Sequence, residues 1–563
     1  MKQSRYKNLS QEGQNFAAFT GSVVGKLRFG TGCKFFSVLI VLLSLALHGY
    51  WTYEIKPGTA PGSVDPFLKI IQGYSLYTTN FNTQSLYYPL KDIDMEREFI
   101  PFQRDIFAIR LNHDLIGPFP IALSALIACM LYFCSPFFLF YIFAFLNFLL
   151  YFFIYNNVRK SRHILIFIFF GLPFFIPNSE VSEHSIIVFQ QVLSLGLLFK
   201  FVKNRHSKKR NFDLALSGLC LGSILFFRHE IMIFALFMVL SILFYSIQKS
   251  KRKLFEAKHL FIFVAGISVS FLLFFALNLY LYNNFLGPRV VANSSAIFSS
   301  ITEKVNFFKT ILWKNPPWFG FFGYSRIYLL TLLGFFYFRK RFNSIDRILL
   351  ASCFGMFLFI PLLAPNDGGA PWGARYLFLA VYPMVYLTAK LIGLIYARND
   401  RNLRYIFIFL FYLFIAHTLY VESRGIVSMV KVGDMQRGYI SEIKSEKADL
   451  YVFTNELVVM QVGLQYLLRP LVLLNDESKI EMFDKKILMS PNYKQIVLIE
   501  PKLNHINPGA FSVEERKGFS PQKIIKAFDQ RLFKLKTMER EYTILHVYQN
   551  TRHTDEKNFS VKP

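Results

Sequence analysis

Residues 259–282 read HLFIFVAGISVSFLLFFALNLYLY, and this run of 24 residues contains no aspartate, glutamate, lysine or arginine. A helix needs about 20 apolar residues to cross the roughly 30 Å hydrocarbon core of a bilayer. Because lipid offers no hydrogen-bond partners to the backbone, such a run is expected to be an α-helix. The stretch therefore predicts a membrane-spanning helix.

Similar apolar runs recur along most of the chain. With 66 Phe, 30 Tyr and 53% hydrophobic residues among 563, the chain is more apolar than a soluble protein of this length. The pattern predicts a polytopic α-helical membrane protein with about eleven to thirteen spans. The further runs lie at 35–51, 114–134, 137–157, 164–177, 185–202, 212–228, 230–247, 323–338, 346–364, 377–397 and 403–421.

The formal net charge of +27 follows the same organisation. Short segments between apolar runs are rich in lysine and arginine, which is typical of cytoplasmic loops and of contact with anionic membrane lipids. No basic stretch interleaves stacking aromatic residues in a polar segment, so we do not expect nucleic-acid binding. The basic segments are 159–162, 203–210, 249–253, 339–341 and 398–404.

If those segments face the cytoplasm, the remaining loops face the outer side. The outer loops are then 52–113, 178–184, 228–230, 283–323 and 366–375, together with the C-terminal tail. Between the first outer loop and the basic segment after it, only an odd number of crossings is allowed, yet two apolar runs occur there. The run from Leu115 contains Gly117, Pro118 and Pro120, so we expect one of the two runs to be re-entrant or to lie against the outer face.

Three parts of the chain are predicted. Residues 1–33 form a basic cytoplasmic N-terminus, residues 34–421 form the transmembrane core, and residues 422–563 form a small α/β domain on the outer side. In the tail, apolar alternation predicts strands at 449–454, 469–474, 494–500 and 542–548, with helices at 456–468 and 521–535. No small-residue cleavage site follows the first run, so it is interpreted as a retained span.

Asp65 is a candidate catalytic base. It lies in the first outer loop and precedes Pro66, which disfavours a helical conformation at Asp65 and favours a helix start just after it. An aspartate in this place can cap the helix, or it can accept a proton from a substrate hydroxyl. Both interpretations stay open from the sequence.

Two further outer segments concentrate ionisable residues. In the loop 178–184, Glu180 and His184 are four residues apart and would share a helix face, while Glu183 adds a second acid. A glutamate–histidine pair can bind a divalent ion or hold a hydroxyl, although a solvated helix cap is the alternative. Arg228 and Glu230 flank a tight turn, where they either face a cavity or form a helix-end ion pair.

A phosphate-binding segment is predicted between residues 366 and 376. Its glycines and prolines let the backbone approach a ligand, and Arg375 comes at the start of the next apolar run. Arginine at a helix N-terminus favours an anion such as phosphate, while Tyr376 is either part of that site or an interfacial anchor. Arg289 supplies another arginine from the outer loop 283–323.

Together these segments resemble the GT-C glycosyltransferases, in particular the bacterial branch related to mannosyl- and arabinosyl-type polyprenyl-phosphate-sugar transferases. The resemblance covers residues 30–420 and lies in the order and sidedness of the motifs. Those motifs are a basic N-terminus, an early outer Ser63-Val64-Asp65, an outer Glu183-His184, an Arg228-x-Glu230 turn and the stretch Trp372-Gly373-x-Arg375-Tyr376.

The resemblance implies a GT-C-like transmembrane core and sugar transfer from a polyprenyl-phosphate donor to a glycan, lipid or protein acceptor. The reaction would take place on the outer side of a bacterial cytoplasmic membrane. Asp65 would be the general base, while Arg375 and Tyr376, with Arg228 and Arg289, would hold the donor phosphate. Glu180, Glu183 and His184 would shape the acceptor site.

Metal dependence and two other functions stay open at this stage. The first outer loop lacks the paired acids of many GT-C enzymes, because Pro66 follows Asp65, so a divalent metal is neither required nor excluded. One alternative is a polysaccharide polymerase or O-antigen-type ligase. The other is a flippase or transporter of lipid-linked glycans, whose ionisable residues should lie in mid-span along a path.

Overall fold

The structure is a computed structural model that describes most of the chain. The predicted cytoplasmic N-terminus and nearly all of the predicted first span lie outside the described residues. The described residues are 39, 42, 43, 46, 64–102, 108–111, 114–158, 162–172, 181–204, 206–247, 255–293, 300–315, 318–366, 375–398, 400–456, 459, 462–502 and 521–551.

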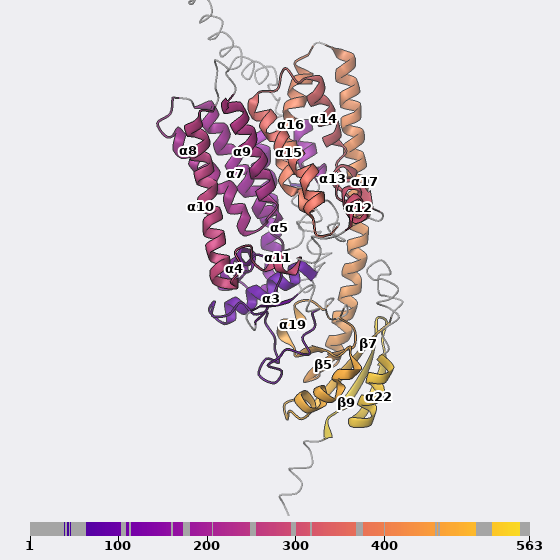
Figure 1. Ribbon diagram of the computed structural model, residues 1–563. Helices are drawn as coiled ribbons and strands as arrows, with labels where there is room; N and C mark the ends of the chain where they lie inside the picture. The colour runs from indigo at the N-terminus through magenta and orange to yellow at the C-terminus, as the bar shows by residue number, and fades with distance from the viewer. Residues whose placement is uncertain are drawn as a thin grey trace, which may run out of the picture.

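Long apolar helices form a bundle that makes up the upper part of Figure 1. Six helical segments of the described chain are long and apolar enough to cross a membrane: Pro136–Val158, His184–Lys203, Ala257–Tyr282, Ser344–Leu363, Arg375–Tyr396 and Arg401–Ser445. The chain is therefore a multi-pass membrane protein. The bundle helices are α5 (Leu139–Val158), α6 (Arg162–Phe170), α7 (His184–Lys203), α8 (Arg210–Ser223), α9 (Ile231–Ile247), α10 (Ala257–Tyr282), α14 (Ile327–Tyr337), α15 (Ser344–Leu363), α16 (Phe378–Tyr396) and α17 (Arg401–Ser445).

The six long segments match predicted spans, whereas other predicted spans form shorter helices. α9 has 17 residues, α8 has 14, α14 has 11 and α6 has 9. At about 1.5 Å per residue, each is shorter than the roughly 30 Å hydrocarbon layer. The described helices thus give six full-length spans, and the total of eleven to thirteen stays a prediction.

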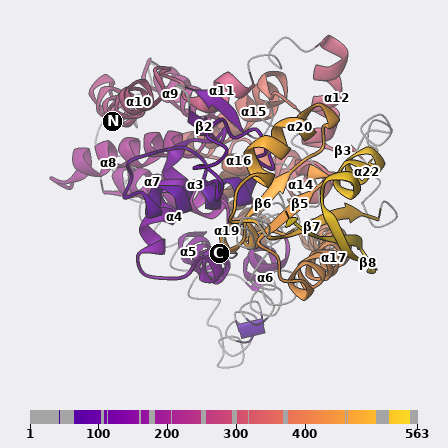
Figure 2. The same cartoon turned by 90° about the horizontal axis from the view of Figure 1, so that it is seen from below.

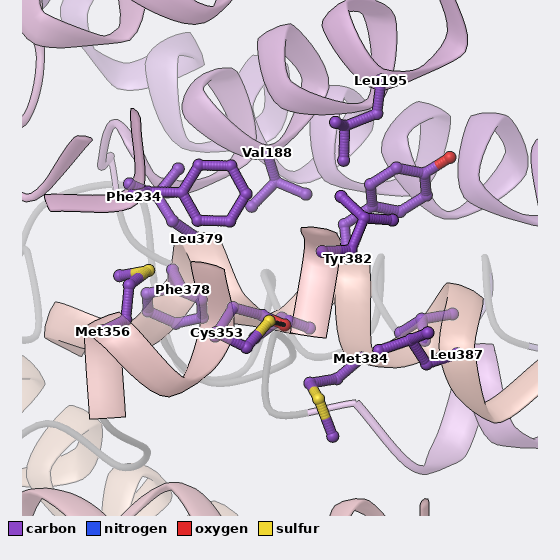
Figure 3. Packing of buried hydrophobic residues seen from close by; sticks show 14 of the residues in the cluster. Val188, Leu195, Phe234, Cys353, Met356, Phe378, Leu379, Tyr382, Met384 and Leu387 are labelled. Carbon is purple, nitrogen blue, oxygen red and sulfur yellow. Dashed lines mark hydrogen bonds between the residues drawn. The ribbon is translucent and has the colours of Figure 1, made fainter. Parts of the chain in front are cut away.

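The interior of the bundle is apolar. Figure 3 shows Val188 and Leu195 of α7 packed toward Tyr382 of α16, with Cys353 and Met356 of α15 close by. All five side chains are buried within one hydrophobic cluster. With no hydrophobic drive between helices in lipid, such close packing is what holds a membrane bundle together.

The ambiguous run at 114–134 does not form a full span. Its first residues pair in a short hairpin, in which β1 (Ile109–Leu111) is antiparallel to β2 (Asp114–Ile116). After the prolines come the 11 residues of α4 (Ile121–Leu131), about 16 Å in length. In Figure 1, α4 lies at the lower end of the bundle beside α3 (Val64–Thr78). This arrangement favours the second alternative above, a helix against the outer face, and leaves α5 as the one crossing.

Short helices and strands connect α10 to α14, and a 3₁₀ turn precedes α16. They connect the long helices and carry two of the predicted outer segments. They are α11 (Pro288–Ala292), α12 (Ile301–Leu312), β3 (Lys314–Asn315), β4 (Trp318–Phe319), α13 (Phe321–Tyr324) and the 3₁₀ turn η5 (Arg375–Leu377).

The C-terminal region forms a mixed five-stranded sheet of order β6-β5-β7-β9-β8. β5 runs parallel to β6 and β7, whereas β9 is antiparallel to β7 and β8. The strands are β5 (Leu450–Phe453), β6 (Leu471–Leu473), β7 (Gln495–Pro501), β8 (Phe533–Glu539) and β9 (Thr543–Gln549), with short helices α19 (Gln465–Leu468), α20 (Ile480–Phe483) and α22 (Pro521–Arg531), 3₁₀ turn η6 (Glu477–Lys479) and π turn η7 (Asp484–Leu488).

The four predicted strands correspond to β5, β6, β7 and β9. The predicted helix at 521–535 ends earlier, because α22 stops at Arg531 and β8 begins at Phe533. The predicted helix at 456–468 is described only in part: Glu456 and Val459 are helical, and α19 follows after a turn at 462–464. The strand β8 was missed because its first residues, Phe533 to Leu535, were assigned to the predicted helix at 521–535.

One helix joins the bundle to the sheet. α17 continues without interruption for 45 residues, about 68 Å, from Arg401 to Ser445. The predicted domain boundary at 422 therefore falls inside a helix. The boundary was placed where the hydropathy of the sequence falls. The helix continues past that point to Ser445, so the fall in hydropathy does not mark the end of the helix.

The sheet packs on the described part of the predicted first outer loop, residues 64–102 and 108–111, which is called the first outer segment below. The two views agree on this (Figures 1 and 2). Residues of the segment 67–143 and of the sheet share one buried hydrophobic cluster. The backbone N–H of Leu473, on edge strand β6, donates to the carbonyl of Phe99 at 2.9 Å. The first outer segment and the C-terminal sheet therefore lie at the same end of the bundle.

Close contact between α3 and α4 yields a test of this arrangement. A Cβ atom on Gly73 would lie 2.7 Å from Cγ2 of Ile127 and 2.9 Å from the carbonyl oxygen of Ser124. Gly73→Ala should therefore lower the free energy of unfolding by about 1–3 kcal/mol, because overpacking forces the helices apart. Thermal unfolding of the detergent-solubilised protein measures the effect. Gly393→Ala in α16 is the control, since nothing lies within 4 Å of its added Cβ, and equal stability of the two variants would contradict the packing.

Candidate active site

The N-terminal turn of α3 carries the first two side chains of the site. Asp65 is in the first turn of the helix, and Lys69 follows one turn later on the same face. The next residues of α3 are apolar and fully buried, including Phe67, Leu68 and Ile70. Burial of these side chains fixes the helix against its neighbours and so sets the position of Asp65.

Asp65 forms an ion pair with Arg375, 310 residues later in the chain. Nη1 of Arg375 donates to Oδ2 of Asp65 at 2.7 Å. The two side chains are 27% and 19% exposed, so the pair is accessible to a ligand. The guanidinium lies 5.4 Å from the ring centre of Tyr376, whose hydroxyl donates to Oδ1 of Asn366 at 2.7 Å.

Glu183 is the buried centre of the cluster. It immediately precedes α7, and its carboxylate contacts Nζ of Lys69 at 2.7 Å and Nε of Arg228 at 2.6 Å. All three side chains are at most 5% exposed. The contact with Lys69 attaches α3 to the bundle, while the contact with Arg228 attaches the turn before α9.

The ion pairs continue beyond Arg228. Glu230 accepts from Nη1 of Arg228 at 3.3 Å and from Nη2 of Arg289 on α11 at 3.4 Å. Nη2 of Arg228 also lies 3.1 Å from Nε2 of His184. Since Arg228 is the donor, Nε2 accepts, and Nδ1 of His184 is left to donate to the hydroxyl of Ser182 at 2.9 Å.

The basic side chains of the cluster lower the pKa values of the carboxylates of Glu183 and Asp65. Burial opposes ionisation of Glu183, but Arg228 and Lys69 outweigh it and hold the pKa of Glu183 well below its ordinary 4.5. Burial likewise opposes ionisation of Asp65, and Arg375 and Lys69 outweigh it and hold the pKa of Asp65 below 3.8. Both groups are therefore anions at neutral pH.

The cluster nevertheless has more cations than anions. Four basic side chains, Lys69, Arg228, Arg289 and Arg375, face three carboxylates, those of Asp65, Glu183 and Glu230. The buried Nε of Arg375 has no hydrogen-bond partner among the described residues. An excess positive charge and a donor without an acceptor suit an anionic ligand.

Most of the predicted site residues come close together in the structure, although the sequence did not show which of them contact one another. Asp65 and Arg375 form one ion pair, with Tyr376 beside it. Glu183, His184 and Arg228 form a second set of contacts, which Arg289 reaches through Glu230 and whose charges act on Asp65. Glu180 lies outside the described residues. Lys69 was missed as a site residue, although its spacing of four from Asp65 was a usable signal. Glu230 forms the ion pair with Arg228 that was one of its two predicted interpretations, although it was not assigned to the site.

The described carboxylates do not fit a divalent metal. Each of the three in this network already contacts a basic side chain, whereas a metal of the Mg²⁺ or Ca²⁺ type is held by several converging oxygens. In the described part of the chain, no group of three or more His, Cys, Asp or Glu is arranged to hold a metal ion. We therefore derive no step through a metal.

A transmembrane helical bundle joined to a C-terminal mixed sheet is the architecture of the GT-C glycosyltransferase fold, which this chain resembles. A similar solved structure is that of ArnT from Cupriavidus metallidurans bound to undecaprenyl phosphate. The two share 11% sequence identity with a TM-score of 0.54, over 93% of this chain and 99% of ArnT. At this identity the likeness concerns the fold.

A second similar structure is the archaeal oligosaccharyltransferase AglB from Archaeoglobus fulgidus, in complex with an inhibitory peptide and a dolichol-phosphate. It is 12% identical with a TM-score of 0.47, over 95% of this chain and 75% of AglB. No family model and no curated protein sequence matches the chain.

The buried carboxylate Glu183 predicts a pH dependence of stability. Its pKa in the folded protein is well below the ordinary 4.5, so its contribution is fully present above pH 4.5 and is lost as the pH falls through the folded pKa. Asp65 acts in the same direction. Thermal unfolding of the detergent-solubilised protein should show a melting temperature that falls progressively below about pH 4.5.

The variant Glu183→Gln separates this residue from other acids. At neutral pH it leaves Lys69 as a buried cation without its counter-charge and Arg228 with Glu230 as its remaining partner, which should lower stability by about 3–5 kcal/mol. The difference in melting temperature between wild type and variant should shrink as the pH falls. A difference that stays constant with pH would show that Glu183 is not the responsible group.

Proposed function

We propose that this protein transfers a sugar from a polyprenyl-phosphate donor to a hydroxyl of an acceptor at the outer surface of a bacterial cytoplasmic membrane. The observation that carries the proposal is the accessible pair of Asp65 and Arg375. A carboxylate that can take a proton and a guanidinium that can take a phosphate are in direct contact at 2.7 Å. Both lie at the end of a membrane bundle.

A lipid phosphate suits the site as donor. The cluster has an excess of positive charge at the end of the apolar bundle, where the head group of a membrane lipid lies. ArnT, which has a similar fold, is bound to undecaprenyl phosphate in its structure. We assign donor-phosphate binding to Arg375 and Tyr376, with Arg228 and Arg289 adding positive charge from behind.

The reaction is a displacement at the anomeric carbon. The acceptor oxygen forms a bond to that carbon as its proton passes to Asp65, and the bond between the carbon and the phosphate oxygen breaks. The leaving phosphate keeps the electron pair, and Arg375 stabilises its charge. A single displacement inverts the anomeric configuration, and Asp65 returns its proton to solvent.

The same ion pair provides a way to activate the base. Before the donor binds, Arg375 lowers the pKa of Asp65 and so makes the carboxylate a weak base. A donor phosphate competes with Asp65 for the guanidinium and neutralises its charge. Asp65 then becomes the stronger base that proton abstraction requires, and only when the donor is present.

The sidedness follows from the basic segments. The described basic residues after α7, α14 and α16 lie at the opposite end of the bundle from α3, which carries Asp65. The positive-inside rule assigns that end to the cytoplasm. We therefore place the site and the C-terminal sheet on the outer side.

We assign Glu183 and His184 to the acceptor position. The acceptor is a glycan, a lipid or a protein.

Asp65→Asn tests the base. The amide keeps the shape of the side chain but cannot accept the proton, so turnover of purified protein should fall by about 10²–10⁴-fold. The assay follows release of polyprenyl phosphate from a labelled polyprenyl-phosphate sugar, with membrane insertion checked in parallel. Asp92→Asn, at an exposed acid of the same outer segment, is the matched control and should keep wild-type turnover.

Three outcomes would contradict the proposal. Normal turnover of Asp65→Asn would remove Asp65 from the catalytic role. Binding or movement of the donor by the wild type without release of polyprenyl phosphate would indicate a transporter. Transfer of a preassembled glycan chain in place of a single sugar would indicate a polymerase or ligase.

Arg375→Ala tests the phosphate contact. Loss of a charge-assisted hydrogen bond is worth about 1.5–3 kcal/mol, so the dissociation constant of the donor should rise by about 10- to 150-fold. The acceptor KM should change little, because the acceptor lies on the side of Asp65. Arg110→Ala, at an exposed arginine of β1, is the control; an unchanged donor affinity in Arg375→Ala would place the phosphate elsewhere.

A further inference from the structure

Three aromatic rings meet at the first turn of α3, which carries Asp65. Phe67, two residues further along α3, lies 5.8 Å from Phe102 and 6.1 Å from Tyr466, measured between ring centres. Phe102 and Tyr466 are 5.4 Å apart, and all three pairs are edge-to-face. The three side chains are at most 2% exposed. The first turn of α3 is thus held by a close-packed aromatic cluster.

Tyr466 brings this contact from the far end of the chain. It belongs to α19 of the C-terminal region, while Phe67 and Phe102 belong to the first outer segment. Its hydroxyl donates to the carbonyl oxygen of Tyr87 at 3.0 Å, across 379 residues of sequence. The hydrogen bond fixes the ring and prevents it from turning away from Phe67.

Further contacts attach the C-terminal region to the same segment. The rings of Phe99 and Phe483 are 5.1 Å apart, and Lys479 and Lys486 form ion pairs with Glu98 and Glu96 at 3.2 and 2.9 Å. The exposed ion pairs contribute little, so the buried aromatic contacts carry most of the attachment. α3 is therefore held on one side by Glu183 of the bundle and on the other side by the C-terminal region.

We infer that Tyr466 is a positioning residue for Asp65, and that the C-terminal sheet serves to hold the catalytic helix. The inference rests on the proposed function of Asp65. When the donor phosphate takes Arg375, Asp65 loses its charged partner, and its position then depends on the packing of the first turn of α3. Helix ends fray easily, so a buried ring against Phe67 is the contact that keeps the carboxylate in reach of the acceptor.

The test uses full-length protein in nanodiscs and two readouts. Hydrogen exchange of the amides in residues 64–71 reports the rigidity of α3, and steady-state kinetics with a labelled polyprenyl-phosphate sugar reports catalysis. Tyr466→Ala removes the ring, Tyr466→Leu retains apolar volume in case the alanine variant fails to fold, and Tyr466→Phe removes the hydroxyl alone. Tyr548→Leu is the matched control, because Tyr548 is fully buried in the same sheet and packs on Phe528, away from α3.

We expect the Tyr466→Ala and Tyr466→Leu variants to raise exchange in residues 64–71 and to lower kcat by about 10- to 100-fold at unchanged donor KM. Tyr466→Phe should restore kcat to within about fivefold of wild type. Tyr548→Leu should leave both readouts of the folded protein at wild-type values. Unchanged exchange in the Tyr466→Leu variant, or an equal effect of Tyr548→Leu, would overturn the inference.

The two readouts separate this inference from the proposed function. If the wild-type protein shows no turnover, the proposed function fails, and hydrogen exchange still decides whether Tyr466 holds α3. If turnover occurs and kcat does not respond to loss of the ring while exchange does, the sheet stabilises α3 without positioning Asp65, and the inference is overturned.

Discussion

A single buried carboxylate, that of Glu183, forms ion pairs with two buried cations from different parts of the chain, and Glu230 adds a second carboxylate at Arg228. Lys69 comes from the first outer segment and Arg228 from the turn before α9, and neither side chain is more than 5% exposed. An unpaired charge in such a place is strongly unfavourable, so all three groups must meet for the fold to form. Because they meet, the first outer segment has one position on the bundle, and Asp65 reaches Arg375.

The end of the bundle that carries α3 and the sheet is built around that position. α3 lies between the bundle and the C-terminal sheet, and α4 covers it through close packing at Gly73. The edge strand β6 is covered by the first outer segment, since Leu473 bonds to Phe99, which protects an edge that would otherwise be open to pairing. The site is thus formed by segments that each stabilise the others.

The sequence predicted the parts of this fold that depend on solvent. Apolar runs located the long spans, because the bilayer requires about 20 apolar residues wherever a helix crosses it. Short apolar stretches located β5, β6, β7 and β9, since each strand is largely buried in the sheet. They did not locate β8, whose start was assigned to the predicted helix at 521–535, nor the continuation of α17 beyond 421, where the hydropathy of the sequence falls.

For the candidate site, sidedness predicted that Asp65 and Arg375 would lie at the same end, because charge in the loops sets the direction of each span. Their pairing at 2.7 Å could not be derived, since it depends on how α3 is seated. Lys69 was overlooked because a lysine in an outer loop is usually solvated. Its burial follows from Glu183, and an isolated sequence does not show which distant acid a lysine will meet.

The unbroken α17 has a consequence for how this chain can vary in length. One residue inserted between 422 and 445 would turn everything beyond it by about 100° and shift it by about 1.5 Å. The sheet would then face away from α3. Adding about seven residues, or two full turns, would restore the rotation of the sheet. It would still move the sheet about 10 Å further along the helix axis, away from α3. An ordinary linker tolerates insertions and deletions, but this helix does not.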